Sequence, residues 1–260
     1  RRYVDKLFII FPFEVEYFAR RGIDAVYEGN PLMDAIAERC AAMPPREEFF
    51  RANGFGARPV IALLAGSRRS EVRNNLPFMA ALAELMPEYD FVLAAVPWLD
   101  RELYGELLAG SRIICLYDKT YEIVRYADAA VVTSGTATLE TALIGTPEVV
   151  CYRTDALTVW AGRRLLKIPY ISLVNLVMGR EVVKELIQQE MTPERAAEEL
   201  RALLPGGGQR ERILADYDAL RKRIGGPGAS ERVAARMVAL LKGEKAPRPT
   251  EREQENGGAK

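Results

Sequence analysis

The sequence predicts an α/β fold of the doubly wound, Rossmann-like kind, in which helices cover both faces of a parallel sheet. Three observations support this prediction. As far as Arg153, short apolar runs alternate with longer stretches whose apolar residues recur with the period of a helix. The runs are apolar throughout, which is typical of strands buried on both faces. Their alternation with helices is the order expected of a parallel sheet.

The predicted elements follow one another regularly up to Arg153. Strands are expected at residues 7–11, 59–65, 91–96, 112–116, 128–132 and 148–152. Helices are expected from about Glu14, from Arg69 to Met86, from Arg101 to Leu108, from about Thr120 and directly after Ser134. Each helix lies between two strands, as the crossover between parallel strands requires.

The pattern changes after Arg153. A helical stretch is expected at residues 157–166, an irregular segment at 169–179, and three further helical stretches between 180 and about 242. Residues 243–260 are polar and rich in proline and glycine, so we expect a disordered tail.

Composition excludes several classes of function. Basic and acidic residues both number 36, so no net charge attracts nucleic acid and no nucleic-acid partner is expected. The absence of histidine rules out Ser-His-Asp and Cys-His nucleophiles. The three cysteines have no close spacing, which fits a reducing cytoplasm. No run approaches the roughly 18 apolar residues of a membrane span, and no signal peptide is expected.

The first candidate site is LLAGSRRSEV, where a predicted strand leads into a helix. In an open parallel sheet, ligands bind beyond the carboxyl ends of the strands. Gly66 allows the backbone to turn, and Ser67 is a candidate cap for the helix. Arg68 or Arg69 follows at the edge of the sheet. An arginine beside unpaired N–H groups at a helix start is suited to a phosphate.

The second candidate site is DAAVVTSGTATLETALIGTPEVVCYR. The residues that build the start of its helix are Ser134, Gly135, Thr136 and Thr138. Backbone N–H groups and hydroxyls at such a start can hold an anion. Glu140 lies four residues beyond Thr136 on the same helix face, within reach of a pair of ribose hydroxyls just past the anion. A phosphate followed by a sugar describes a nucleotide.

The residues by themselves leave a second interpretation open. A Ser-Gly-Thr turn is often only a capped helix start, and an acid near that start is favoured by the helix dipole. A capping box, however, places the acid three residues after the cap, and those positions after Ser134 and Thr136 hold Ala137 and Leu139. Nucleotide binding and a well-capped helix are both compatible with this pattern.

Other patterns carry less weight. The sequence lacks GxxxxGK[ST] and GxGxxG, so neither a P-loop nor a standard dinucleotide fold is indicated. Asp216 and Asp218 lie two apart in a helical run, where they point to different sides, so no metal site is expected. The segment VWAGRRLLK, with Trp160, is a candidate contact with an anionic membrane or simply a surface helix.

Taken together, LLAGSRRSEV, SGTATLE and PYISLVNLVMGREVVKELIQ, with PFE and GNPLMD upstream, resemble lipid-A-disaccharide synthases. These are inverting hexosyltransferases of the two-Rossmann-domain (GT-B) kind. The resemblance runs from near residue 4 to about residue 205. It implies transfer of 2,3-diacylglucosamine from UDP-2,3-diacylglucosamine to 2,3-diacylglucosamine 1-phosphate (lipid X), giving the β-1′,6 disaccharide of lipid A and UDP. It also implies that no metal or other cofactor takes part.

The resemblance implies roles for particular residues in the donor site. Arg68 would face the diphosphate as the catalytic group, and Glu140 would hold the ribose. The other residues implied to bind the donor are Gly66, Ser67, Ser134, Gly135, Thr136, Thr138, Asn175, Glu185 and Gln188. A helix dipole and an arginine that stabilise departing UDP are a physically sensible substitute for a metal.

The sequence departs from the family pattern in three respects. Ala65 stands where proline is commoner, and Asn30 stands where many members have histidine. The family's N-terminal domain, with its GExSGD motif and catalytic aspartate, has no counterpart in this sequence. We therefore expect residues 1–30 to be the end of the acceptor domain and residues 31–242 to be the donor domain with its closing helices. Such a fragment is expected to bind UDP without forming disaccharide unaided.

The acylated substrates imply a peripheral protein at the inner face of the cytoplasmic membrane, and the family implies a homodimer. Two alternatives from other classes remain. One is another UDP-sugar enzyme of the same fold, such as a UDP-N-acetylglucosamine 2-epimerase or a peptidoglycan transferase. The other is a non-catalytic nucleotide-binding module.

Overall fold

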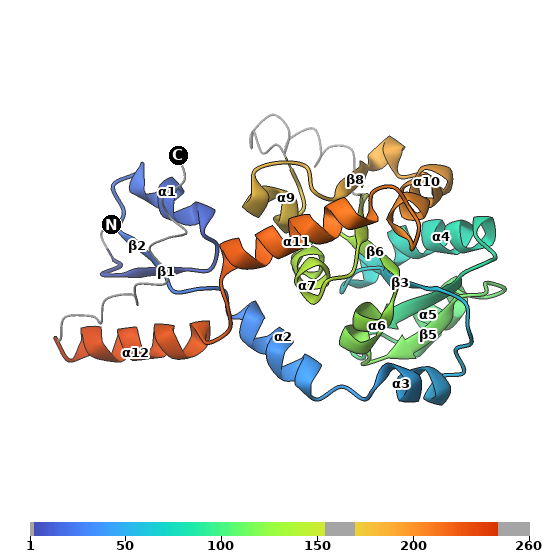
Figure 1. Cartoon of the computed structure of the whole chain (residues 1–260), viewed down its shortest axis with the longest axis horizontal. Coiled ribbons are helices and arrows are strands. Elements are labelled where there is room, and N and C mark those ends of the chain that lie inside the picture. The colour runs from blue at the N-terminus through green and yellow to red at the C-terminus, as the bar shows by residue number, and fades with distance from the viewer. Residues whose placement is uncertain (1–2, 154–169, 244–260) are drawn as a thin grey trace. The chain divides into compact units, whose positions relative to one another are not determined.

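The computed structural model describes residues 3–153 and 170–243. The chain forms two compact units. One consists of Arg1–Glu38 with Ala219–Lys260, and the other consists of Arg39–Asp218. Figure 1 follows the chain through both units from the N-terminus to the C-terminus.

The larger unit is built on one sheet of six parallel strands in the order β5-β4-β3-β6-β7-β8. Its strands are β3 (Val60–Leu64), β4 (Asp90–Ala95), β5 (Ile114–Tyr117), β6 (Ala129–Thr133), β7 (Glu148–Tyr152) and β8 (Lys184–Ile187). Every residue of β3 and β6 is buried, as the continuous apolar runs predict for strands covered on both faces. The predicted doubly wound α/β fold is confirmed.

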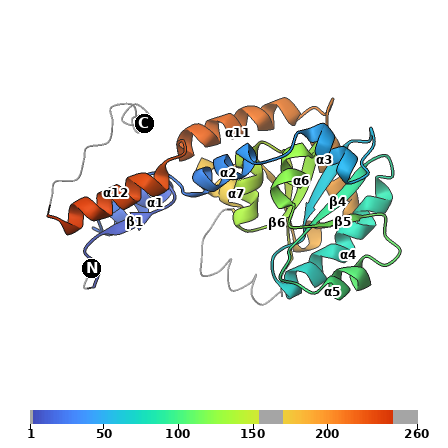
Figure 2. The same cartoon turned by 90° about the horizontal axis from the view of Figure 1, so that it is seen from below.

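Helices cover both faces of this sheet. They are α3 (Arg46–Ala52), α4 (Arg69–Leu85), α5 (Arg101–Leu107), α6 (Thr120–Tyr126), α7 (Thr136–Ile144), α9 (Leu173–Met178) and α10 (Pro193–Leu203), with a short 3₁₀ turn η1 (Gln188–Glu190). α4 and α10 pack together on one face (Figure 1), and α6 packs beside α7 on the other (Figure 2). Two more helices, α2 (Leu32–Ala41) and α11 (Arg210–Ile224), contain the boundaries between the units.

The order of the strands reverses between β3 and β6, the two central strands. The chain runs from β3 outward to β4 and β5, and later from β6 outward to β7 and β8. β3 and β6 pair directly, with Ile61 opposite Ala129. The loops beyond the carboxyl ends of two such strands diverge, and this is where open α/β sheets bind their ligands. Both candidate sites from the sequence follow these two strands.

The smaller unit contains the N-terminal residues and the last described helix. Its elements are β1 (Leu7–Ile9), α1 (Phe13–Ala19), β2 (Ala25–Tyr27) and α12 (Ala229–Leu241). β1 and β2 are parallel, with Leu7 opposite Ala25. Asn30, which is 3% exposed, accepts from the N–H of Leu32 at 2.9 Å and so begins α2.

Polar contacts join the N-terminal and C-terminal segments that make up the smaller unit. The carboxylate of Asp34 accepts from the N–H groups of Gly228 and Ser230 and so caps the start of α12. The hydroxyl of Tyr27 donates to the carbonyl of Ile224 at 2.6 Å. Many large apolar side chains of this unit remain exposed; they are Tyr3, Val4, Ile10, Val15, Tyr17, Met237, Val238 and Leu241.

The structure corrects several predicted elements. The segment 169–179, predicted to be irregular, contains α9, and the stretch from residue 180, predicted to be helical, begins with strand β8. β2, α2 and α3 were not expected between residues 14 and 59. The helix predicted at 157–166 and nearly all of the predicted tail lie outside the described residues.

The two compact units divide the chain differently from the predicted domains. The sequence places one boundary near residue 30 and leaves all later helices in the donor domain. In the structure α12 belongs to the same unit as β1 and β2. The assignment of acceptor and donor roles to these parts stays a prediction.

Candidate functional site

The carboxyl ends of the two central strands are held together by one buried amide. Asn75, on α4, donates to the carbonyl of Ala65 at 3.1 Å and to the hydroxyl of Thr133 at 2.9 Å. Ala65 follows β3, and Thr133 is the last residue of β6. Because Asn75 is only 1% exposed, these bonds are shielded from water and hold the two candidate loops in one arrangement.

The loop after β3 turns at Gly66 and is filled by the carboxylate of Glu71. Gly66 has a φ of 109°, and a Cβ added there would lie 2.5 Å from the Cβ of Glu71. One Glu71 oxygen accepts from the N–H groups of Ser67 at 2.9 Å and Arg68 at 3.2 Å. Only glycine fits this turn, since any larger residue meets both strain and the glutamate. The start of α4 is therefore capped by its own acid.

One prediction for this loop is wrong. Ser67 does not cap α4, because the N-cap residue is Arg68 and the capping group is Glu71. The N–H groups of Ser67 and Arg68, which precede the helix, are engaged by Glu71. The Arg68 guanidinium donates to Glu71 at 2.6 Å while its side chain is 78% exposed, and Arg69 pairs with Asp100. Exposed ion pairs contribute little, so Arg68 can turn toward a phosphate at small cost.

The loop after β6 leaves the start of α7 open. Gly135 and Thr136 are exposed, and the first turn of α7 carries no acid and no side-chain cap. Between residues that the structure describes, no hydrogen bond engages the N–H of Gly135, Thr136 or Ala137. Unpaired N–H groups at the positive end of a helix form an anion site. This is the position where the sequence predicted a phosphate.

Two hydroxyls of the same loop are turned toward the protein. Ser134 donates to the carbonyl of Ile171 at 3.0 Å. Thr138 is 0% exposed and donates to the carbonyl of Gly135 at 2.9 Å. These hydroxyls shape the turn, so the groups left open at this helix start are the backbone N–H groups and the exposed Thr136. Ligand contact by Ser134 and Thr138 stays a prediction that this geometry does not favour.

Glu140 points toward a tyrosine on the neighbouring helix. The hydroxyl of Tyr121, on α6, donates to one carboxylate oxygen of Glu140 at 2.8 Å. Burial raises the pKa of Tyr121, and the adjacent Glu140 carboxylate raises it further. Glu140 is partly buried, and its second oxygen accepts no hydrogen bond from any residue in the described part of the chain. The carboxylate therefore keeps one oxygen available for a ligand.

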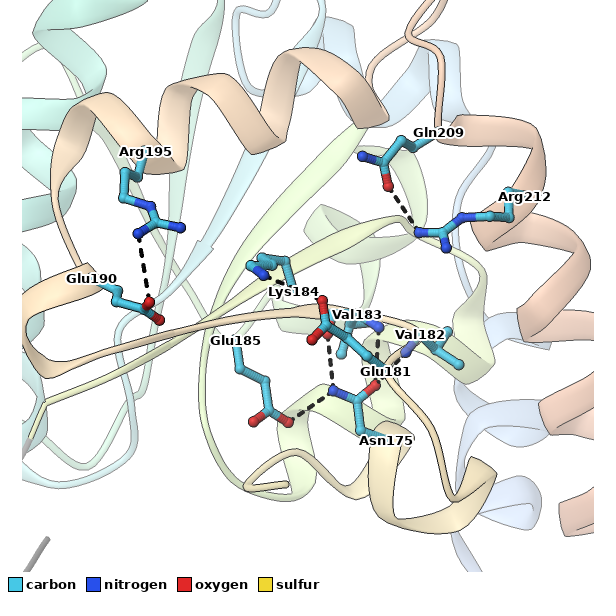
Figure 3. A network of polar contacts seen from close by, with 10 residues as sticks. All are labelled: Asn175, Glu181, Val182, Val183, Lys184, Glu185, Glu190, Arg195, Gln209 and Arg212. Atoms are coloured by element: carbon cyan, nitrogen blue, oxygen red, sulfur yellow. Dashed lines mark hydrogen bonds and ion pairs between the residues drawn. The ribbon is translucent and has the colours of Figure 1, made fainter. Parts of the chain in front are cut away.

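Asn175 and Glu185 form a polar network (Figure 3). The Asn175 carbonyl oxygen accepts from the N–H groups of Val182 at 2.7 Å and Val183 at 3.0 Å. Its amide donates to the carbonyl of Val183 and to the carboxylate of Glu185, both at 2.9 Å. Asn175 is 0% exposed, and its hydrogen-bonding groups are used within the chain. We assign it to positioning, and a direct contact with a ligand stays a prediction.

The same network supports the open start of α7. Glu185 accepts from the N–H of Ile171 at 3.1 Å and from that of Ser172 at 2.9 Å. The carbonyl of Ile171 in turn receives the Ser134 hydroxyl. A chain of hydrogen bonds thus links β8 to the loop after β6. Gln188 follows this strand as the first residue of η1, in a left-handed conformation with φ of 54°, and its predicted contact with the donor stays a prediction.

Two weaker candidates from the sequence are the Asp216–Asp218 pair and the segment around Trp160. Asp216 pairs with Arg180 at 2.6 Å, and its side chain is 15% exposed. In residues 3–153 and 170–243 no three metal-binding side chains come together, and no helix has both the length and the apolar character to cross a bilayer. Trp160 lies outside the described residues.

Sequence reasoning missed Tyr121, Glu71 and Asn75. Glu71 had a signal, since it stands three residues after Arg68 in the acid position of a capping box. Tyr121 and Asn75 had no such signal, because each bonds to a residue of another element. Tyr121 on α6 contacts Glu140 on α7, and Asn75 on α4 contacts the ends of β3 and β6. Their partners lie 19 and 58 residues away in the sequence.

Comparisons with known proteins agree on one family. A family model described as lipid-A-disaccharide synthetase matches residues 1–235. A lipid-A-disaccharide synthase of Myxococcus xanthus is 39% identical over 231 residues, which cover 86% of this chain and 60% of that protein. One of Syntrophus aciditrophicus is 40% identical over 234 residues, covering 85% and 59%. The chain thus spans about 60% of the length of these relatives.

Solved structures agree on the fold. A UDP-GlcNAc 2-epimerase from Neisseria meningitidis bound to UDP-GlcNAc has a TM-score of 0.58 at 15% identity, covering 89% of this chain and 59% of that one. The co-structure of S. aureus MnaA with UDP has a TM-score of 0.59 at 15% identity, covering 90% and 60%. At such identities the likeness concerns the fold alone.

Proposed function

The chain belongs to the lipid-A-disaccharide synthetase family, and from this premise we propose that it forms the donor-nucleotide part of a glycosyltransferase. The reaction transfers 2,3-diacylglucosamine from UDP-2,3-diacylglucosamine to lipid X and releases UDP. The observation that carries the proposal is the open start of α7, with Glu140 one turn further along at the point where the strand order reverses.

The geometry suits a nucleoside diphosphate. The N–H groups at the start of α7 and the hydroxyl of Thr136 face the diphosphate, and the helix dipole favours its negative charge. Arg68 approaches from the loop after β3, which Asn75 holds against the end of β6. Glu140 accepts from the ribose hydroxyls with its remaining oxygen. Each group thus matches one part of UDP.

Charge stabilisation is the catalytic contribution of these residues. As the acceptor hydroxyl attacks the anomeric carbon, the bond to the diphosphate breaks and negative charge grows on departing UDP. The helix start and Arg68 hold that charge in a fixed arrangement. The proposal requires no metal, and it assigns the base that takes the hydroxyl proton to the acceptor side. An undiminished rate in excess chelator is the expected result for the assembled enzyme.

The smaller unit fits a role on the acceptor side. Several large apolar side chains of this unit, such as Tyr3, Val4 and Tyr17, are more than a third exposed, and exposed apolar surface commonly marks an interaction site. We propose that other acceptor-side residues cover them and complete the enzyme. The chain alone is then expected to bind UDP and to form no disaccharide. Disaccharide found by mass spectrometry with the purified chain would contradict this part of the proposal.

Acylated substrates place the assembled enzyme at the inner face of the cytoplasmic membrane, where we propose that it binds as a peripheral homodimer. Vesicle sedimentation and analytical ultracentrifugation test these two properties separately. An epimerase of the same fold would also bind UDP, but the family match favours transfer over epimerisation. Product analysis with both substrates distinguishes the two reactions.

The direct test is calorimetric titration of UDP into the chain and into its Glu140→Ala variant. Loss of hydrogen bonds to a charged acceptor costs about 1.5–3 kcal/mol, so we expect roughly ten- to hundredfold weaker binding. Glu198→Ala, at an exposed position of α10, is the matched control and should bind as the unaltered chain does. If circular dichroism shows that the chain is folded and calorimetry shows no UDP binding, the proposed donor site is wrong.

A further inference from the structure

We propose that Tyr121 is a positioning residue for the donor nucleotide, which it serves by orienting the Glu140 carboxylate toward the ribose. This inference rests on the proposed function, in which Glu140 accepts from the ribose hydroxyls. It adds a residue on a different helix, α6, to the group that determines ligand specificity. The contact that carries it is the hydrogen bond from the Tyr121 hydroxyl to Glu140 at 2.8 Å.

The position of the tyrosine suits this role. Tyr121 is the second residue of α6, directly after the loop that leaves β5, and Glu140 lies one turn inside α7. The two helices pack side by side on the same face of the sheet. A glutamate side chain has three rotatable bonds and is poorly ordered when it is held at one end only. The Tyr121 hydroxyl fixes one oxygen and leaves the other for a ligand.

The chemistry also suits a permanent donor. Burial and the neighbouring carboxylate both raise the pKa of Tyr121, so its hydroxyl keeps its proton throughout the neutral range. The guanidinium of Arg39 lies over the tyrosine ring, 5.7 Å from its centre, which favours one orientation of the ring. A neutral donor bound to Glu140 orders the carboxylate without cancelling the charge that attracts the ribose hydroxyls.

A purely structural role makes a different prediction. If Tyr121 only joins α6 to α7, removing its hydroxyl lowers the stability of the fold and weakens the binding of all nucleotides by the same factor. If it orients Glu140, the loss of binding affinity is greater for ligands that carry both ribose hydroxyls. The ratio of the dissociation constants for 2′-deoxy-UDP and UDP separates these cases, because the two ligands differ in one hydroxyl at the proposed contact.

The experiment measures this ratio by calorimetry for the unaltered chain and for Tyr121→Phe. We expect the unaltered chain to bind UDP about tenfold more tightly than 2′-deoxy-UDP, as one hydrogen bond to a charged group allows. In Tyr121→Phe we expect this ratio to fall by a factor of about three or more. Tyr126→Phe is the matched control. It lies on the same helix and loses a hydroxyl that donates to the carbonyl of Pro44, so its ratio should not change.

A double variant completes the test. Once Glu140→Gln has removed the carboxylate, adding Tyr121→Phe should leave the ratio where it is, because the tyrosine acts through the glutamate. An unchanged ratio in Tyr121→Phe, with a reduced ratio in Glu140→Gln, would overturn this inference and leave the proposed function standing. Absence of UDP binding by the folded, unaltered chain would overturn both.

Discussion

The side-chain amide of Asn75 donates to the hydroxyl of Thr133 at 2.9 Å, and so joins helix α4 to the end of strand β6 across the point where the strand order reverses. The same amide donates to the carbonyl of Ala65 at the end of β3. One buried side chain therefore sets the spacing between the loop that carries Arg68 and the loop that precedes α7. The proposed diphosphate site depends on that spacing.

Replacing Asn75 by alanine is expected to lower the free energy of unfolding by about 1–3 kcal/mol, because it leaves buried polar groups of Ala65 and Thr133 without their donor. It should also weaken UDP binding, since the two loops lose their connection. Urea denaturation and calorimetry measure the two effects. Asn74→Ala, at the adjacent exposed position, should change stability by no more than about 0.5 kcal/mol. Equal effects of the two substitutions would contradict the assignment.

Arg68→Ala is expected to weaken the binding of UDP by roughly ten- to hundredfold and to leave the binding of uridine unchanged. The reason is that a guanidinium facing the diphosphate has no partner on the nucleoside. Arg73→Ala, at another exposed position of α4, is the control. Parallel titrations with the two ligands test this. Equal losses for UDP and uridine would mean that Arg68 only stabilises the loop through Glu71.

Asn175→Asp preserves shape but turns a donor into an acceptor beside the Glu185 carboxylate and the Val183 carbonyl. A buried charge without a partner destabilises by about 3–5 kcal/mol, so we expect a loss of this order in urea denaturation at pH 7. The loss should shrink at pH 5, where protonation of the new carboxyl restores a donor. Gln189→Glu, nearby and exposed, is the control. An Asn175→Asp variant as stable as the unaltered chain would show that the network is dispensable.

Glu148, at the start of β7, is fully buried, and burial raises its pKa well above the usual range. Neither carboxylate oxygen has a hydrogen-bond partner in the described part of the chain. The folded state therefore keeps the proton to a higher pH than the unfolded state, which releases it above about pH 4.3. Stability contributed at this position is greatest below that pH and falls as the pH rises toward the folded pKa.

Glu148→Gln stays uncharged in both states, so its stability relative to the unaltered chain should rise with pH above about pH 4.3, by up to about 1.4 kcal/mol per pH unit while Glu148 stays protonated in the fold. Urea denaturation across this range measures the difference. Glu198→Gln alters an exposed acid on α10 and should follow the unaltered chain. Parallel stability curves for Glu148→Gln and the unaltered chain would show that Glu148 is ionised in the fold.

The fold class and the candidate loops were predictable from the sequence because they depend on local patterns. Strands covered on both faces need continuous apolar runs, and β3 and β6 carry them. Gly135 and Thr136 in the sequence predict a helix start whose N–H groups are left unpaired. β8 and α9 escaped prediction, since each is short and mixes polar with apolar residues.

What only the tertiary structure decided is which polar side chains meet. The sequence placed Glu140 one turn inside α7, but only the packing of α6 against α7 brings Tyr121 to it. It placed Asn75 inside a helix, but only the pairing of β3 with β6 gives its amide two acceptors. Helical and strand periods act over a few neighbouring residues. Contacts across 19 or 58 residues depend on how whole elements pack, and no local pattern records that.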